Sequence, residues 1–268
     1  MAVQSTSPSD VKALRKRKKD SHKGDNGKLL ILAGSKDYHG SLILCVLAAM
    51  RFCDLVYVHS TDQNLALVRK LKEATPNVIV VEKARLDEFF GKADAYLLGP
   101  GWEENKTSER MLARAIASKK PVVLDASALH MLKPKMLEKN VLITPHGGEF
   151  RSLFGMRADE KSVKAMAGKY GCTILCKGAA DLIASPQKFK TNKTHHEGMT
   201  CGGSGDVLAG LAAALAADHN ELFAAACAGA YVNGLAGVRL SKKMGAHYAA
   251  SDLAQELAPA ARAAQKRV

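Results

Sequence analysis

A glycine-rich turn followed at once by an apolar helix is the part of this chain best suited to chemistry. The segment reads Gly198-Met199-Thr200-Cys201-Gly202-Gly203-Ser204-Gly205-Asp206-Val207-Leu208-Ala209-Gly210, and a helix is predicted from Asp206 to about Ala217. The first turn of a helix carries unpaired N–H groups and partial positive charge, and glycines let an anion approach them closely. The pattern therefore predicts a phosphate site, with N–H groups donated by Gly203, Ser204 and Gly205.

One aspartate, Asp206, stands at the junction between the turn and the helix. A carboxylate beside a bound phosphoryl group can take a proton from an attacking hydroxyl. Aspartate is also a favoured helix cap, so the same residue has a purely structural interpretation. We predict that Asp206 is a general base, and the motifs in the rest of the chain favour this role over a purely structural one.

The elements that must position this turn alternate between strands and helices from Lys28 onward. Strands are expected at residues 28–33, 55–59, 78–81, 95–98, 122–124, 141–143 and 173–176, with a small hairpin at 182–184 and 188–190. Helices are expected at residues 42–51, 64–74, 108–118, 160–169, 222–240 and 252–264. This alternation predicts an α/β fold of three α/β/α layers around a mostly parallel central sheet. The scarcity of aromatic residues, 5% of the chain, suits helices packed tightly on such a sheet.

Polar residues or glycines follow five of the predicted strands. In parallel sheets, ligands bind beyond the carboxyl ends of the strands. One glycine at a strand end is routine, but five such signals are hard to attribute to turns alone. They are Gly34-Ser35, Gly99-Pro100-Gly101, Asp125, His146 and Lys177-Gly178.

Each of these strand-end residues has a functional and a structural interpretation. The amine of Lys177 either reaches a nucleotide phosphate or is exposed in a turn. His146 either binds a ligand or caps a helix that opens near Glu149, and Gly101 leaves room for a ligand to lie flat. Asp125 binds a metal or a ribose, or caps the next helix. Nothing in the chain has metal-ligand spacing, so any Mg²⁺ would arrive with a nucleotide.

Composition and charge narrow the classes of protein further. The net charge is +13, and the basic run Arg15–Lys19 has no aromatic residues for base stacking, which argues against a nucleic-acid partner. Residues 1–20 are predicted to be a basic, flexible segment and residues 21–268 a single domain. No apolar run reaches the roughly 18–20 residues needed to span a bilayer, and no signal peptide is evident. The six cysteines lack C-x-x-C or zinc spacing, so we expect reduced thiols, no membrane association and a cytoplasmic protein.

As a set, these motifs resemble the NAD(P)H-hydrate dehydratases of the ribokinase-like superfamily, over roughly His22 to the end of the chain. A Gly-x-Gly-Asp pattern is shared across that superfamily, whereas the longer block from Gly198 with Thr144-Pro145-His146 upstream is typical of the dehydratases. The other matching segments are Ser21–Gly24 with Gly27, Gly34-Ser35 with Tyr38 and Gly40, Gly99–Gly101, Leu124–Ala126 with Ala128-Leu129, Glu149, and Lys177-Gly178.

The resemblance implies a metabolite-repair reaction. ADP or ATP, with Mg²⁺, phosphorylates the hydroxyl of the hydrated nicotinamide ring of NADH or NADPH, and loss of phosphate restores the dihydronicotinamide. It implies a homo-oligomer, a tetramer, with Asp206 as the catalytic residue. The implied substrate-binding residues are Ser41, Gly101, His146 and Asp206. The implied nucleotide-binding residues are Lys177, Gly178, Ala179, Ala180, Asp181, Gly203, Ser204 and Gly205.

The chain departs from the family pattern at several of these positions. Ser41 stands where alanine is usual, Gly147 where proline is usual, and Ser204 where threonine is usual. Asp181 would bring a negative charge close to a bound nucleotide. Because the segment before His22 is short, we expect no counterpart of the epimerase domain that precedes this one in some relatives.

Two alternatives remain open at this stage. A small-molecule kinase of the same fold, similar to hydroxyethylthiazole or sugar kinases, would use the same Asp206 and release a phosphorylated product. A non-enzymatic nucleotide- or nucleic-acid-binding protein would account for the positive charge and would not need the Asp206 carboxylate.

Overall fold

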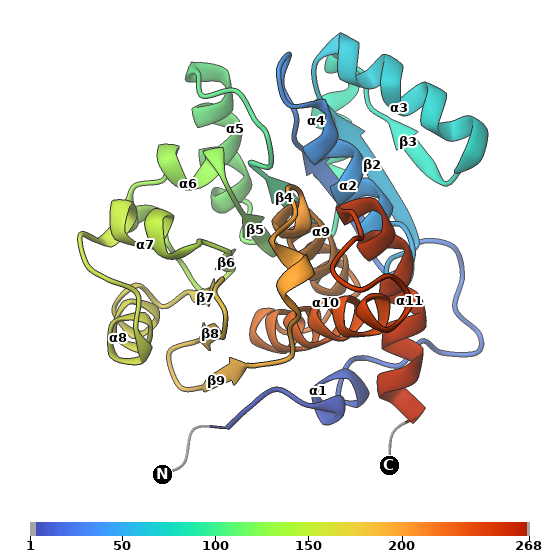
Figure 1. Ribbon diagram of the computed structural model, residues 1–268. Coiled ribbons are helices and arrows are strands. Elements are labelled where there is room, and N and C mark those ends of the chain that lie inside the picture. The colour runs from blue at the N-terminus through green and yellow to red at the C-terminus, as the bar shows by residue number, and fades with distance from the viewer. Residues whose placement is uncertain (1–3, 267–268) are drawn as a thin grey trace.

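The computed structural model describes residues 4–266, which are built around one nine-stranded sheet (Figure 1). The strand order is β3-β2-β1-β4-β5-β6-β7-β8-β9, and β1 to β7 are parallel, whereas β8 and β9 run antiparallel to their neighbours. The strands are β1 (Lys28–Leu32), β2 (Leu55–His59), β3 (Val78–Val80), β4 (Ala95–Leu98), β5 (Val122–Leu124), β6 (Val141–Ile143), β7 (Thr173–Cys176), β8 (Asp181–Ala184) and β9 (Phe189–Asn192). The predicted parallel sheet and terminal hairpin are confirmed.

Helices cover both faces of this sheet, which confirms the three-layer α/β/α prediction. The helices are α1 (Pro8–Lys12), α2 (His39–Ala49), α3 (Asp62–Ala74), α4 (Leu86–Lys92), α5 (Lys106–Ala117), α6 (Ser127–Met131), α7 (Gly147–Phe154), α8 (Glu160–Tyr170), α9 (Ser204–Ala217), α10 (Leu222–Met244) and α11 (Ala250–Lys266). Short 3₁₀ turns lie at η1 (Lys83–Arg85), η2 (Pro134–Met136) and η3 (Glu197–Thr200). The sequence patterns did not predict α1, α4 and α6, which are too short to show a clear helical period.

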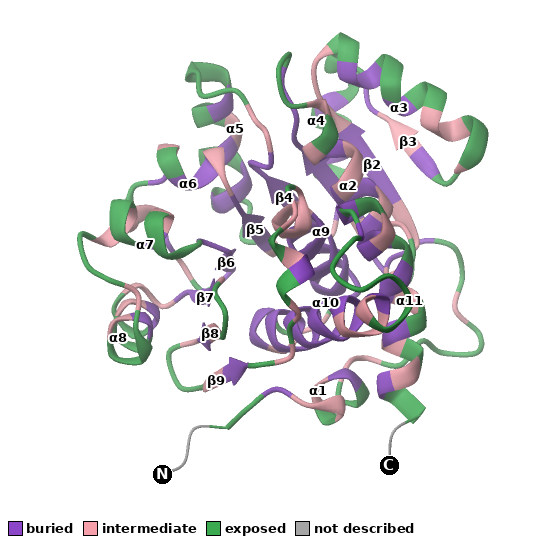
Figure 2. Cartoon of the chain, viewed as in Figure 1, coloured by how far each residue is buried: buried purple, intermediate pink, exposed green. Residues whose placement is uncertain are grey.

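Alternate residues of each buried strand point to opposite layers. Leu29 and Ile31 belong to a buried cluster with residues of α2, α9, α10 and α11, whereas Leu30 and Leu32 belong to a second cluster with residues of α4, α5 and α8. Because both faces are covered, the strands are apolar at nearly every position, as expected for a parallel sheet. Figure 2 shows the strands, α9 and α10 as the buried centre, with exposed surfaces on α3, α5 and α8.

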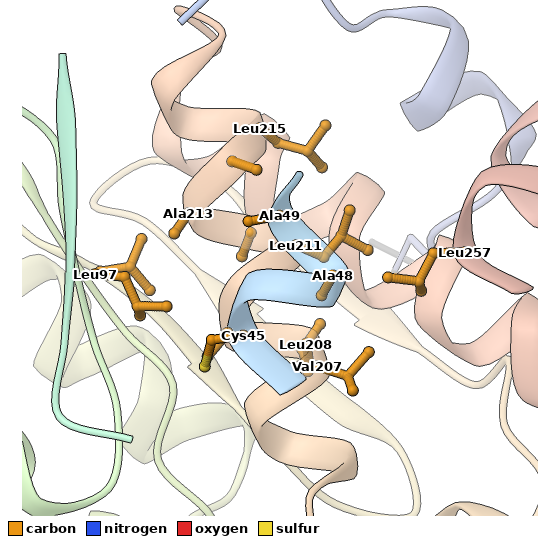
Figure 3. Close-up of a cluster of buried hydrophobic side chains, with 14 of the residues drawn as sticks. Cys45, Ala48, Ala49, Leu97, Val207, Leu208, Leu211, Ala213, Leu215 and Leu257 are labelled. Carbon is orange, nitrogen blue, oxygen red and sulfur yellow. The ribbon is translucent and has the colours of Figure 1, made fainter. Parts of the chain in front are cut away.

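Helix α9 lies at the centre of one layer, and small residues allow it to sit there. Every residue from Val207 to Ala217 is buried. A Cβ on Gly210 would lie 2.6 Å from the carbonyl oxygen of Cys45, so the backbones of α9 and α2 are in close contact. Figure 3 shows the packing of small and branched side chains around this crossing. Dense packing on both sides fixes the position of the N-terminus of α9.

Residues 4–15 of the segment predicted to be flexible make contacts with the body of the protein. The backbone of Thr6 pairs with Thr191 of the edge strand β9, with an N–H to oxygen distance of 2.8 Å. Val11 of α1 is buried against α10 and α11. Covering a sheet edge and burying an apolar side chain both favour order over fraying.

Two arginines of the basic run hold this segment on the body of the protein. Arg15 pairs with Asp218 at 2.8 Å, directly after α9, and Arg17 lies 3.6 Å from Asp54. These contacts give part of the basic run a structural role.

One helix among residues 4–266, α10, is long and apolar enough to cross a membrane by length and composition alone. In the fold, 83% of its most apolar stretch is buried inside the protein. A core helix passes the same test, and α10 packs between α9 and α11.

Candidate functional site

The predicted strand-end residues converge where the strand order reverses. From β1 the chain proceeds outward to β2 and β3, then returns to β4 on the other side of β1. Such a switch point leaves a crevice at the carboxyl ends of the strands. The N–H of Gly34, after β1, donates to the carbonyl of Pro100, after β4, at 2.8 Å. A Cβ on Gly99 would lie 1.9 Å from the carbonyl oxygen of Asp125, so this position has no space for a side chain.

The glycine-rich turn places at this edge the N-terminus of α9, which no side chain caps. Helix α9 begins at Ser204, two residues before the predicted start, and Gly203 is its N-cap with φ of 93°. No side chain caps this terminus, in contrast to α7 and α8. The Ser204 N–H is already engaged, at 3.3 Å from the carbonyl oxygen of Cys201. The first turn therefore keeps donors for an anion, and the capping interpretation of Asp206 is wrong because Asp206 lies inside that turn.

Asp206 is a half-buried carboxylate with a high affinity for protons. Burial and the negative charge of Asp125 raise the pKa of Asp206, while a hydrogen bond from Ser41 and the charge of Lys177 oppose the shift. The net effect raises its pKa to about 6. A Cβ on Gly101 would lie 3.0 Å from the Cβ of Ser41, so the fold brings Ser41, Gly101 and Asp206 together as predicted. A carboxylate with this pKa is suited to accept a proton near neutral pH.

Lys177 is held in the same place by a buried carboxylate. Its ammonium donates to Asp125 Oδ1 at 2.6 Å, and Asp125 is 2% exposed. Burial alone would lower the pKa of Lys177, but the charges of Asp125, Glu149 and Asp206 raise it above its usual value. A Cβ on Gly205 would lie 3.3 Å from Lys177 Nζ, so the ammonium lies at the first turn of α9. Lys177 is thus not an exposed turn residue, and Asp125 does not cap α6.

His146 reaches the site through its backbone and caps α7 with its side chain. Its Nδ1 accepts the N–H groups of Gly148 and Glu149 at 3.0 and 3.2 Å, and Glu149 accepts the His146 N–H in return. The backbone of His146 pairs with that of Lys177, next to the Asp125 contact. The capping interpretation of His146 therefore holds, and its exposed ring places Nε2 3.6 Å from Glu149 Oε1.

The loop from Lys177 to Asp181 turns its acidic residue inward. Asp181 accepts the Gly178 N–H at 3.1 Å and an N–H of Asn192 at 2.9 Å. Burial raises the pKa of Asp181, and these two hydrogen bonds oppose that rise. The negative charge that departs from the family pattern is thus used to shape the loop, while Ala179 and Ala180 are exposed.

A pocket of about 270 Å³ adjoins this cluster. Its walls come from the Lys177–Asp181 loop, the first turn of α9, η3 and the middle of α10. Among the predicted nucleotide residues it is lined by Lys177, Gly178, Ala179, Asp181, Ser204 and Gly205. Another cavity, of about 740 Å³, lies between α1, α11 and the C-terminal end of α9, and none of the predicted site residues lines it. We therefore place the candidate site at the smaller pocket, which is lined by Lys177 and by the first turn of α9.

One of the matching motifs serves the opposite end of the sheet. Gly24 and Asn26 donate backbone N–H groups to Asp54, at 3.0 and 3.1 Å. A Cβ on Gly27 would lie 2.4 Å from the carbonyl oxygen of Ala217, at the last turn of α9. This motif fixes the start of β1 and lies away from the catalytic cluster.

Comparisons with known proteins place this arrangement in a family. A sequence profile described as NAD(P)H-hydrate dehydratase matches residues 29–259. The chain belongs to the NAD(P)H-hydrate dehydratase family. It is 35% identical over 267 residues to an ADP-dependent (S)-NAD(P)H-hydrate dehydratase of Nitrosopumilus maritimus, with 92% of each chain covered. It is 38% identical over 260 residues to a bifunctional NAD(P)H-hydrate repair enzyme of Methanocaldococcus jannaschii. That match covers 92% of this chain and 50% of the relative, so this chain spans about half the length of the bifunctional enzyme.

Solved structures show the same fold. An ADP/ATP-dependent NAD(P)H-hydrate dehydratase from Bacillus subtilis, co-crystallised with ATP and Mg²⁺, superposes with a TM-score of 0.83 at 24% identity. It covers 98% of this chain and 99% of its own. A hydroxyethylthiazole kinase from Pyrococcus horikoshii superposes with a TM-score of 0.58 at 17% identity, over 90% of this chain and 89% of its own. The ribokinase-like fold predicted from the sequence is confirmed, and the dehydratase is the better match.

The pocket of this dehydratase-family chain includes residues that the sequence patterns did not single out. They come from β9, the segment after it and the middle of α10: Asn192, Thr194, His195, His196, Ala230, Asn233 and Gly234. Asn233 is 4% exposed and its Oδ1 has no hydrogen-bond partner among the described residues. A lone asparagine inside an apolar, alanine-rich helix is the signal that would have pointed to it.

His146 caps α7 and is predicted to bind the substrate, and substitution can separate the two roles. We expect His146→Ala to lower the free energy of unfolding by about 1 kcal/mol, because α7 loses its cap. His146→Asn keeps a capping side chain, so it should restore most of that stability while the KM for substrate stays raised. Chemical denaturation and steady-state kinetics on both variants test this. Normal substrate binding by the alanine variant would show that His146 is only a cap.

Proposed function

We propose that this protein dehydrates hydrated NADH and NADPH in an ADP- or ATP-dependent reaction, which makes it a carbon–oxygen lyase of metabolite repair. The observation that carries the proposal is the carboxylate of Asp206 in the uncapped first turn of α9, with the Lys177 ammonium beside it. Membership of the family supports the reaction class. Asp206, Ser41, Gly101 and His146 would contact the substrate, and the pocket of about 270 Å³ would hold the nucleoside.

In the first step, the oxygen of the ring hydroxyl attacks the terminal phosphorus of the nucleotide, and the Asp206 carboxylate accepts the proton of that hydroxyl. The bond from that phosphorus to its bridging oxygen breaks, and the nucleotide leaves with one phosphate fewer. Donors for the phosphoryl oxygens come from the Gly205 and Asp206 N–H groups and from Lys177. In the second step the ring carbon–oxygen bond breaks, phosphate departs, and a neighbouring ring carbon loses a proton. The nucleotide therefore serves to turn a hydroxyl into a good leaving group.

We propose that Mg²⁺ accompanies the nucleotide and is not a resident ion. Among residues 4–266, no group of three or more histidine, cysteine, aspartate or glutamate side chains is arranged to hold a metal. Asp125, a buried carboxylate whose charge acts on Asp206, is already engaged by Lys177. When bound, Mg²⁺ would neutralise charge on the phosphates, and the side chains described above would carry out the proton transfer.

The decisive assay follows the return of dihydronicotinamide absorbance after hydrated NADH is mixed with the protein and either ADP or ATP. We expect the absorbance to recover with at least one nucleotide and to stay flat without any. Running both donors also shows which is preferred. Loss of nucleotide with accumulation of a phosphorylated ring, and no recovery of absorbance, would indicate a kinase.

The pKa of Asp206 predicts the acidic limb of the pH profile. Only the ionised carboxylate can accept a proton, so kcat/KM should fall below about pH 6, by about tenfold for each further pH unit. Initial rates measured from acidic to mildly alkaline buffer, with the fold monitored by circular dichroism, test this. A flat profile across the acidic range would exclude Asp206 as the base.

Two further properties are proposed from the family resemblance. We infer a homo-oligomer, a tetramer, which light scattering on the purified protein tests directly. We also place the activity in the cytoplasm, supported by six free cysteines of which five are buried, as expected for a reducing compartment.

A further inference from the structure

Asp125 is a buried carboxylate at the site, fixed by contacts of both its side chain and its backbone, and the proposed reaction has not yet given it a role. Its carboxylate is 2% exposed and accepts the Lys177 ammonium at 2.6 Å. Its backbone is fixed as well, because its N–H donates to Leu98 and its carbonyl oxygen accepts the Ala128 N–H, both at 3.2 Å. A side chain on Gly99 would collide with that carbonyl.

The turn directly after Asp125 is strained. Ala126 has φ of 49° and ψ of −124°, a conformation that residues with a Cβ rarely adopt. Such strain persists only where the surrounding structure imposes it, and it gathers at functional sites. The strained turn carries the chain from β5 into α6, and the side chain of the residue before it, Asp125, contacts Lys177 directly after β7.

The position that Lys177 occupies is electrostatically unfavourable without Asp125. The ammonium lies at the N-terminus of α9, where the helix already carries partial positive charge. A flexible lysine would turn away from that terminus toward solvent. The buried carboxylate keeps the ammonium in place while no anion is bound. A phosphoryl group that binds at the first turn of α9 would then meet a preorganised cation.

We propose that Asp125 is a positioning residue of the reaction, which acts through Lys177 by holding its ammonium at the first turn of α9 ready for the transferred phosphoryl group. This inference rests on the proposed function for its kinetic consequence. Its electrostatic consequence is independent of any substrate.

The same carboxylate influences Asp206. The groups facing Asp206 are Asp125 from the end of β5, Lys177 from the end of β7, and Ser41 from α2, with the Cys45 thiol of α2 donating to the Asp206 carbonyl. Glu149 of α7 also acts on Lys177. The negative charge of Asp125 raises the pKa of Asp206, second only to burial. Removing that charge while keeping the shape should therefore lower the pKa of Asp206.

The test compares Asp125→Asn, Lys177→Met and the double variant with the unmodified enzyme. For Asp125→Asn we expect kcat at saturating substrates to fall about tenfold or more, with a smaller change in the KM for nucleotide. The acidic limb of the pH profile of kcat/KM should move down by about one pH unit. In the double variant the loss should be no larger than for Lys177→Met alone, because Asp125 acts through Lys177. Asp54→Asn is the matched control, because Asp54 also accepts hydrogen bonds but lies at the far end of the sheet. In this variant kcat and the acidic limb of the pH profile should stay unchanged.

The double variant also guards against misfolding, since it removes both partners of the buried Asp125–Lys177 ion pair and leaves neither of them unpaired. A measurement without substrate separates this inference from the proposed function: titration of the Asp206 carboxyl carbon by ¹³C NMR. We expect its midpoint to be lower in Asp125→Asn than in the unmodified protein, whether or not the chain proves to be a dehydratase. An unmoved midpoint, or losses from Asp125→Asn and Lys177→Met that multiply, would overturn the proposal.

Discussion

Asp206→Asn is expected to abolish turnover while leaving nucleotide affinity nearly unchanged. The amide has almost the same shape and can keep the Ser41 contact, but it cannot accept the hydroxyl proton. Loss of a general base costs about 10²–10⁴-fold in rate. Recovery of dihydronicotinamide absorbance measures turnover, and calorimetric titration with ADP measures affinity. An Asp206→Asn enzyme with normal turnover would refute the general-base role and favour the non-enzymatic alternative.

A matched control comes from the first turn of another helix. Asp62 lies in the first turn of α3 and is exposed, so Asp62→Asn changes the same chemical group at the same kind of position. Its kinetics should equal those of the unmodified enzyme. If both variants lose activity, the effect comes from handling of the protein and says nothing about Asp206.

The same substitution should also change stability, with a definite sign. The folded-state pKa of Asp206 is about 6, above its ordinary value of 3.8, so between these values the folded protein binds more protons than the unfolded chain. Stability contributed by this group therefore falls as pH rises through that window. Asn removes the penalty, so we expect Asp206→Asn to be more stable by about 1–2 kcal/mol near pH 8 and equal near pH 4. Such a gain, with lost activity, is typical of a residue kept for function.

Lys177→Met is expected to reduce kcat by about 10²–10³-fold. Methionine fills a similar volume but removes the ammonium that lies at the first turn of α9 and is held by Asp125. The change leaves the Asp125 carboxylate buried without its partner, so the melting temperature should also drop. Steady-state kinetics at saturating nucleotide separate lost catalysis from weaker binding, and a thermal scan sets the range in which the fold is intact.

Stability and catalysis are separated by a second variant and a control. Asp125→Asn in the Lys177→Met background should restore much of the melting temperature without restoring kcat. Lys161→Met, on the exposed surface of α8, should change neither. If the stabilised double variant recovers activity, Lys177 serves the fold and has no part in the reaction.

Much of this site was predictable because its signals are local. The parallel strands read directly as short apolar runs, since burial on both faces leaves no polar alternation. The glycines before Asp206 and at Gly101 mark places where the backbone comes close to something else, and the fold shows close approaches at both regions. Local signals were also insufficient in places: by residue type Asp206 could cap α9, yet Gly203 is its N-cap, and nothing in the local pattern showed that Val11 is buried.

The sequence by itself determined the layers, the family and the residues that meet at the edge of the sheet, because apolar periodicity and short glycine motifs depend on neighbours along the chain. The tertiary structure alone decided which side chains touch. Asp125 and Lys177 are 52 residues apart, and only the adjacency of β5, β6 and β7 brings them within 2.6 Å. The pKa of Asp206 likewise depends on burial and on charges from other strands. No local pattern records such distances, because electrostatic coupling follows separation in space and not in sequence.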